Sequence, residues 1–220
     1  MGLNISKGNM YEWVTHTWNT IKGKCPHDCS YCYMKRYSQS DLHFDEKELK
    51  TDLGNGNFIF VGSSCDMFAD DIPYEWIIKT LERCIIFDNT YLFQTKNPKG
   101  FNDVYLAEID KLKLCVTIET NRVYPEIMRN APEPIERAFL FTNIPIKEKY
   151  ITIEPIMDFD LQSMYYLIAQ CNPIQVNIGA DSGNNNLPEP DSNKIHELIE
   201  ALDQITIVKQ KKNLKRLFND

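Results

Sequence analysis

Three of the chain's seven cysteines fall within eight positions, as Cys25, Cys29 and Cys32 in the stretch GKCPHDCSYCYM at residues 23–34. Closely spaced thiolates hold zinc or iron–sulfur clusters, so the C-x3-C-x2-C spacing indicates a metal centre. A structural zinc site commonly takes four ligands as two separated pairs. Three thiolates on one loop suit a 4Fe-4S cluster in which one iron has no protein ligand.

A structural zinc site stays open as the alternative. The other cysteines are scattered along the chain and form no second pair; they are Cys65, Cys84, Cys115 and Cys171. His27 lies inside the loop and could complete a zinc set, although a ligand between two other ligands is sterically awkward. In this alternative the chain is a non-catalytic interaction module whose zinc is structural.

The elements that must position this loop are short strands followed by helical stretches. Seven runs rich in β-branched and aromatic residues predict strands, at 13–18, 57–62, 90–95, 114–119, 150–155, 174–179 and 205–210. Their near-continuous apolar character is typical of parallel strands covered by helices. Between them, residues 70–84, 158–171 and 190–202 have helical signals in their capping residues and apolar spacing.

This alternation predicts an α/β fold, with one domain over residues 1–220. We expect a partial (β/α)6-type barrel of mostly parallel strands, in which the run at 205–210 is a candidate seventh, C-terminal strand. A closed barrel of eight units usually needs about 250 residues, more than this chain has. Functional residues in such folds follow the strand C-termini, and the cysteine loop follows the first predicted strand.

Polar residues also follow the other predicted strands. They are Asp66, Lys96, Glu119, Asn121, Glu154, Asp181, Ser182 and Lys209. Each could be a helix cap, a turn residue or a surface charge, and Glu119 or Glu154 could pair with Lys96 or Lys209 in a structural network. Their shared position after consecutive strands predicts a polar site on one rim of the barrel.

Composition indicates a soluble, cytoplasmic protein without a membrane segment. No run approaches the roughly 20 apolar residues of a membrane span, and the first residues lack the apolar region of a signal peptide. A reducing compartment disfavours disulfides, which again favours a metal centre. The net charge of −7 argues against a general electrostatic nucleic-acid binder. The basic stretch KQKKNLKRL from Lys209 is the exception; it is either a solvated helix end or a contact for phosphate.

The cysteine loop, with Tyr31 before its last cysteine, resembles that of the radical S-adenosylmethionine (radical SAM) superfamily. Further stretches occur in the order seen in a small phage-type branch of that superfamily, known as a domain of unknown function. They are TWNTIKGKC, VGSSCDMFADDIP, FQTKNP, VTIETN, ITIEPI, NIGADSG and IVKQ. The resemblance spans nearly the whole chain, and the cysteine motif is its most specific part.

The resemblance implies an enzyme, an oxidoreductase or a lyase, with one 4Fe-4S cluster on Cys25, Cys29 and Cys32. S-adenosylmethionine (SAM) would bind the open iron and be cleaved reductively to a 5′-deoxyadenosyl radical that abstracts hydrogen from a substrate. It further implies an electron donor such as flavodoxin or ferredoxin. The substrate is left open, with nucleic acid and protein as the candidates.

The resemblance also assigns roles to residues on the rim. Superfamily members bind the SAM amino group after the second strand, often with Gly-Gly-Glu; this chain has GSSCD there, which makes Ser63, Ser64 and Asp66 the candidates. At the end of the fourth strand, Glu119 would contact the SAM ribose or carboxylate, helped by Thr117 and Asn121.

Three groups of residues on this rim have less specific implied roles. Glu154, Asp181 and Ser182 would bind adenosine or substrate, and Lys96 and Lys209 would hold the SAM carboxylate or an anionic substrate. Cys65 is a candidate hydrogen-atom donor, because some radical enzymes use a cysteine in this way. A buried small side chain is the other explanation of Cys65.

Overall fold

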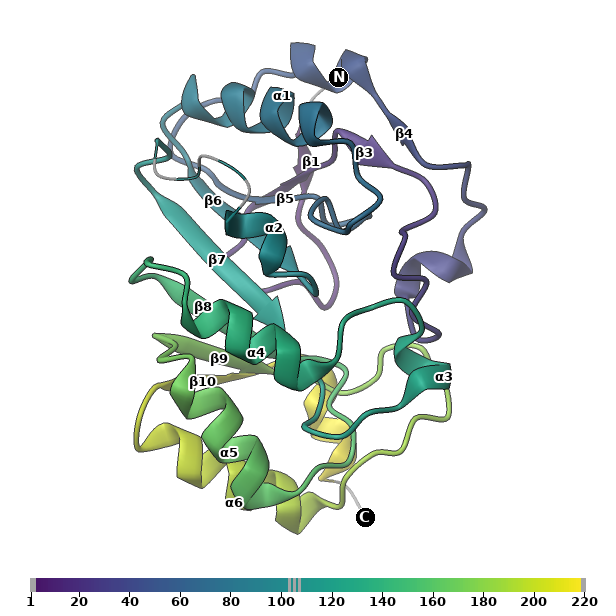
Figure 1. The fold of residues 1–220 in the computed structure, drawn as a ribbon, viewed down its shortest axis with the longest axis vertical. Helices are drawn as coiled ribbons and strands as arrows, with labels where there is room; N and C mark the ends of the chain where they lie inside the picture. The colour runs from purple at the N-terminus through teal and green to yellow at the C-terminus, as the bar shows by residue number, and fades with distance from the viewer. Residues whose placement is uncertain (1–2, 103, 105, 107, 219–220) are drawn as a thin grey trace.

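The computed structural model describes residues 3–102, 104, 106 and 108–218. An eight-stranded sheet forms its centre, in the order β1-β2-β5-β6-β7-β8-β9-β10 (Figure 1). The strands are β1 (Asn4–Ile5), β2 (His16–Trp18), β5 (Phe58–Val61), β6 (Thr90–Thr95), β7 (Leu112–Thr117), β8 (Lys149–Ile153), β9 (Gln175–Ile178) and β10 (Ile207–Gln210). A separate two-stranded sheet pairs β3 (Ile21–Lys22) with β4 (His43–Phe44).

The main sheet is parallel from β2 to β10, and β1 alone runs antiparallel, against β2. The prediction of an α/β partial barrel of mostly parallel strands is therefore confirmed, and the run at 205–210 contains a seventh parallel strand, β10. The predicted range 90–95 matches β6 at both ends, and the boundaries of the other parallel strands differ from the predicted ones by at most three residues. The shift at β7 has a consequence: Glu119 lies two residues beyond the strand end at Thr117.

Helices connect the parallel strands. They are α1 (Tyr74–Ile85), α2 (Lys99–Asn102), α3 (Pro125–Met128), α4 (Pro134–Thr142), α5 (Leu161–Gln170) and α6 (Ser192–Asp203). Three short 3-10 helices are η1 (Tyr33–Arg36), η2 (Glu46–Lys50) and η3 (Lys212–Leu217). Helices α4, α5 and α6 lie next to one another along the β7-to-β10 half of the sheet, and α1 lies at the other end of the molecule (Figure 1).

Two apolar clusters hold these layers together. Buried residues of α1, such as Ile77, Leu81 and Cys84, recur at helical spacing and belong to the large core between the helices and the sheet. A smaller cluster joins Tyr11 and Val14 of the N-terminal segment to Phe60, Leu92, Cys115 and Tyr150 of the strands. The N-terminal segment thus packs against a part of the sheet that the helical core does not use. Of the helices described, none is long and apolar enough to cross a membrane.

Candidate functional site

A cavity of about 1010 Å³ opens where the parallel strands end. Its walls come from the segments that follow β2, β5, β6, β8, β9 and β10, and from the N-terminal segment. Twelve of the predicted site residues line it: Cys25, Cys29, Cys32, Ser63, Ser64, Cys65, Asp66, Lys96, Thr117, Glu154, Asp181 and Ser182. Polar groups from consecutive strands therefore do meet on one rim, because the C-termini of parallel strands lie at the same edge.

Three predicted residues lie outside the residues that line this cavity. Glu119 is fully buried behind it. The Asn121 side chain accepts a hydrogen bond from the backbone amide of Asp160 at 2.8 Å, at the start of α5. Lys209 is exposed within β10. Lys211, one residue past the end of that strand, lines the cavity instead.

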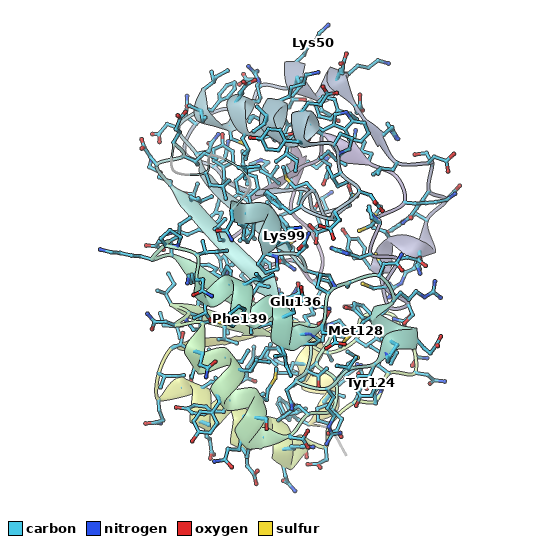
Figure 2. All side chains as sticks on the ribbon, viewed as in Figure 1. Lys50, Lys99, Tyr124, Met128, Glu136 and Phe139 are labelled. Carbon is cyan, nitrogen blue, oxygen red and sulfur yellow. The ribbon has the colours of Figure 1, made fainter. Side chains whose placement is uncertain are left out.

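The cysteine loop is folded by its own turns and held by the segment around α3. The amide of Asp28 donates to the carbonyl of Cys25 at 3.1 Å, and Asp28 has a positive φ of 49°, which Asp tolerates better than most residues. From the α3 side, the carbonyl of Ile127 accepts from Ser30, and Asn130 donates from its backbone amide to His27 and from its side chain to Pro26. Figure 1 shows α3 beside the N-terminal segment that carries η1, and Figure 2 labels Tyr124 and Met128, the residue before α3 and the last residue of that helix.

Asp66 fastens the cysteine loop to the ends of β5 and β6. Its Oδ2 lies 2.9 Å from Nε2 of His27, and the same oxygen accepts from the Thr95 hydroxyl at 2.9 Å and the Lys96 amide at 2.7 Å. Its Oδ1 accepts from the Phe68 amide at 3.0 Å, so Asp66 also orders its own turn. Burial alone would raise the pKa of Asp66, but the His27 ring and these donors outweigh burial and lower that pKa.

The fourth thiol at this end of the cavity belongs to Cys65. Its side chain is buried, and the interaction between the two thiols lowers the pKa of Cys25. All seven cysteines are free thiols. Cys84, Cys115 and Cys171 are buried in the apolar clusters.

Tyr31 turns away from the solvent and connects the cysteine loop to buried charges. Its hydroxyl donates to Oε1 of Glu119, and Nη1 of Arg137 donates to Oε2 of the same carboxylate at 2.6 Å. Lys96 Nζ lies 3.7 Å from Glu119 Oε1. The pairing of Glu119 with Lys96 that the sequence offered as a structural alternative is therefore present. Arg137, from α4, was missed, because one arginine in an amphipathic helix normally indicates the solvent face.

The opposite wall carries a second polar network, built from the ends of β8, β9 and β10. Lys211 Nζ lies 2.6 Å from Oε2 of Glu154, and Asn9 Nδ2 donates to Oε1 at 2.8 Å. The Lys211 ammonium also lies 4.6 Å from the centre of the Tyr11 ring, a cation–π geometry. A Cβ at position 179 would lie 2.8 Å from Glu154 Oε1, so Gly179 leaves room for the Glu154 carboxylate as it is placed here.

The residues around the cysteine loop fit a thiolate-bound cluster with a small polar molecule beside it. Cys25, Cys29 and Cys32 face one cavity, and within the described part of the chain no three His, Cys, Asp or Glu side chains gather closely enough for a single metal ion. Each iron of a cubane takes its own ligand, so cluster ligands need not converge on one point. Next to them, Ser64 Oγ lines the cavity and is buried without a hydrogen-bond partner among the described residues. Such a hydroxyl is available to a bound molecule.

Comparison with known proteins gives structural likeness and no sequence match. No family model matches the chain, and no curated protein matches its sequence. The phage-type branch therefore stays a prediction. A serine-for-cysteine variant of spore photoproduct lyase is similar in structure, with a TM-score of 0.66 and 11% identity over 93% of this chain and 79% of that one.

Two further solved structures carry bound molecules. A spore photoproduct lyase variant with bound AdoMet and dinucleoside spore photoproduct has a TM-score of 0.58 and 11% identity, over 93% of this chain and 66% of that one. SuiB of Streptococcus suis, bound to the precursor peptide SuiA, has a TM-score of 0.57 and 12% identity, over 88% of this chain and 48% of SuiB. At such identities the likeness concerns the fold: the chain has the partial-barrel fold that spore photoproduct lyase and SuiB share.

Proposed function

We propose that this chain is a radical SAM enzyme, with one 4Fe-4S cluster on Cys25, Cys29 and Cys32 and with SAM as its second cofactor. The observation that carries the proposal is a three-cysteine loop that opens onto a large cavity at the strand C-termini. Structural neighbours that are radical SAM enzymes support it. When bound, the reduced cluster and SAM supply a 5′-deoxyadenosyl radical, which abstracts hydrogen from a substrate.

The chain's own residues bind, orient and enclose these cofactors. Asp66, through His27, fixes the cysteine loop. Ser63 and the unpartnered Ser64 hydroxyl are the proposed contacts of the SAM amino group, and Lys96 and Thr117 line the cavity at the ends of the next two strands.

Of the remaining rim residues, some line the cavity at the ends of β8 and β9, and others do not line it at all. Glu154, Asp181 and Ser182 are the proposed contacts of adenosine or substrate, because they line the cavity at the ends of β8 and β9. Asn121 and Lys209 are given no cofactor contact, since neither lines the cavity. Cys65 stays the candidate hydrogen-atom donor: it lines the cavity, and Cys65→Ala should leave SAM cleavage intact and change the products formed on a substrate.

We further propose that residues 1–220 act as one radical SAM domain reduced by a flavodoxin or ferredoxin. The finer classification as oxidoreductase or lyase depends on the substrate. One structural neighbour holds a dinucleoside and another a precursor peptide. Nucleic acid and protein therefore both stay candidate substrates of this chain.

Metal analysis of anaerobically purified, reconstituted protein tests the cluster. We expect brown protein with about four iron per chain, because a 4Fe-4S cluster is held by cysteine thiolates. Cys29→Ala should lose the iron and the colour. The matched control is Cys84→Ala, which removes a thiol from the helical core, away from the cavity. Colourless protein with one zinc per chain and no response to added iron and sulfide would instead favour the structural zinc module.

A further inference from the structure

Three ionisable side chains, two of them fully buried, lie next to the cysteine loop. The side chains of Glu119 and Arg137 are 0% exposed, and that of Lys96 is 18% exposed. They come from three different elements: Lys96 follows β6, Glu119 follows β7, and Arg137 belongs to α4. Burial of ionised groups is costly unless they are paired and hydrogen-bonded, so this arrangement needs a physical explanation.

The contacts within this group hold Arg137 and Glu119 in place. Arg137 donates from Nη1 to Glu119 Oε2 at 2.6 Å and to the Thr117 carbonyl at 3.0 Å, and from Nε to the Pro132 carbonyl at 2.6 Å. Its Nη2 is buried and has no hydrogen-bond partner among the described residues. One donor nitrogen of this fully buried guanidinium therefore has no acceptor among the described residues.

Tyr31 connects these three side chains to the cysteine loop. Its hydroxyl donates to Glu119, its ring lies 5.5 Å from Lys96 Nζ, and it packs in one apolar cluster with Cys29 and Ala131. Tyr31 stands between Cys29 and Cys32 in the sequence, so a shift of its ring would displace two of the three proposed ligands.

The charges in this network do not cancel. Burial would lower the pKa of Arg137, but neighbouring groups, Glu119 first among them, raise it. Burial would raise the pKa of Glu119, but Arg137 and then Lys96 outweigh it and lower that pKa. Lys96 and Arg137 carry two positive charges against the one negative charge of Glu119; Asp66, the other acid that acts on Lys96, is paired with His27. A cluster bound by three thiolates is anionic and gains another negative charge on reduction, so it would supply the missing counter-charge.

We propose that Arg137, Glu119, Lys96 and Tyr31 form a positioning network that holds the cysteine loop and raises the reduction potential of its cluster. This inference rests on the proposed function. The positive charge stabilises the reduced, more negative state of the cluster, because Coulomb interactions are strong where water is excluded. Glu119, on this account, acts on the cluster through Tyr31 and makes no direct contact with SAM.

A redox titration of the reconstituted protein without SAM tests the sign of the effect. Lys96→Met removes a cation and should make the midpoint potential more negative. Glu119→Gln removes the anion at nearly constant shape and should make it more positive. We expect each change to alter the equilibrium between the oxidised and reduced cluster about tenfold, or about 59 mV for one electron. A merely structural role would not shift the two potentials in opposite directions.

The matched control is Lys113→Met. Lys113 lies near the start of β7, far along the strand from the rim, where it pairs with Glu148. Lys113→Met changes the net charge of the protein by the same amount as Lys96→Met, and it should leave the midpoint potential of the cluster unchanged. If Glu119→Gln fails to fold, Lys96→Met decides alone, since its side chain is partly exposed: a more negative potential supports the proposal, and an unchanged one overturns it. Wild-type protein that binds no iron would overturn the proposed function itself, which keeps the two failures distinct.

Discussion

At the scale of single residues, Asp66 joins the cysteine loop to the ends of two strands. One carboxylate receives the His27 ring, the Thr95 hydroxyl and two backbone amides. The sequence predicted Asp66 either as a cofactor contact or as a turn residue. In the structure Asp66 does order its own turn, and it also joins two strand ends to the cysteine loop, because the fold brings His27 within reach.

Asp66→Asn should weaken this support. Hydrogen bonds to a charged group are worth about 1.5–3 kcal/mol each, and we expect a loss of about 2 kcal/mol in the free energy of unfolding of the metal-free protein. The reconstituted variant should also lose iron faster to a chelator. Urea unfolding and chelation kinetics measure the two effects. Asp71→Asn is the control, because Asp71 is an exposed acid that lines the same cavity. Equal behaviour of the two variants would contradict this role of Asp66.

At the scale of elements, the strands were predictable and their supports were not. The seven parallel strands are marked by apolar, β-branched runs, which require no knowledge of distant neighbours. The loop of Cys25, Cys29 and Cys32 is instead held by α3, whose four residues have no periodic pattern to detect. Arg137 was hidden for a related reason: its ion pair with Glu119 exists only because β7 ends at Thr117 and α4 packs beside it.

The support by the segment around α3 can be tested at Asn130, two residues past the end of that helix. Its side-chain amide donates to the Pro26 carbonyl at 3.0 Å, inside the cysteine loop. Asn130→Ala removes that hydrogen bond, which should cost about 1 kcal/mol of stability and should speed the loss of iron to a chelator. Asn143→Ala is the control, since Asn143 makes a similar bond, at 2.9 Å to the Phe139 carbonyl at the end of α4, away from the loop. Figure 2 labels Phe139 on that helix. Faster iron loss in both variants, or in neither, would contradict a specific role of the segment around α3.

At the scale of the whole molecule, the order of elements gave both the fold and the rim on which the candidate site lies. Twelve candidate residues line one cavity because they follow parallel strands. The sequence pattern of a single strand or loop does not predict which side chains reach one another across that cavity. Lys211 rather than Lys209 reaches Glu154, since Lys211 lies past the strand end, where the chain turns into η3. The cysteine loop and the wall formed by Glu154 and Lys211 face the same space of about 1010 Å³. Drug-sized ligands occupy pockets of about 300–1,000 Å³, so this cavity lies at the upper end of that range.

Cleavage of SAM by the reduced, reconstituted protein tests the central claim most directly. The product, 5′-deoxyadenosine, is quantified by mass spectrometry with and without a chemical reductant. We predict product from the wild type that depends on the reductant, product from Cys84→Ala, and none from Cys29→Ala. No product from reduced wild-type protein that carries its full iron content, or equal product from Cys29→Ala, would contradict the assignment of this chain as a radical SAM enzyme.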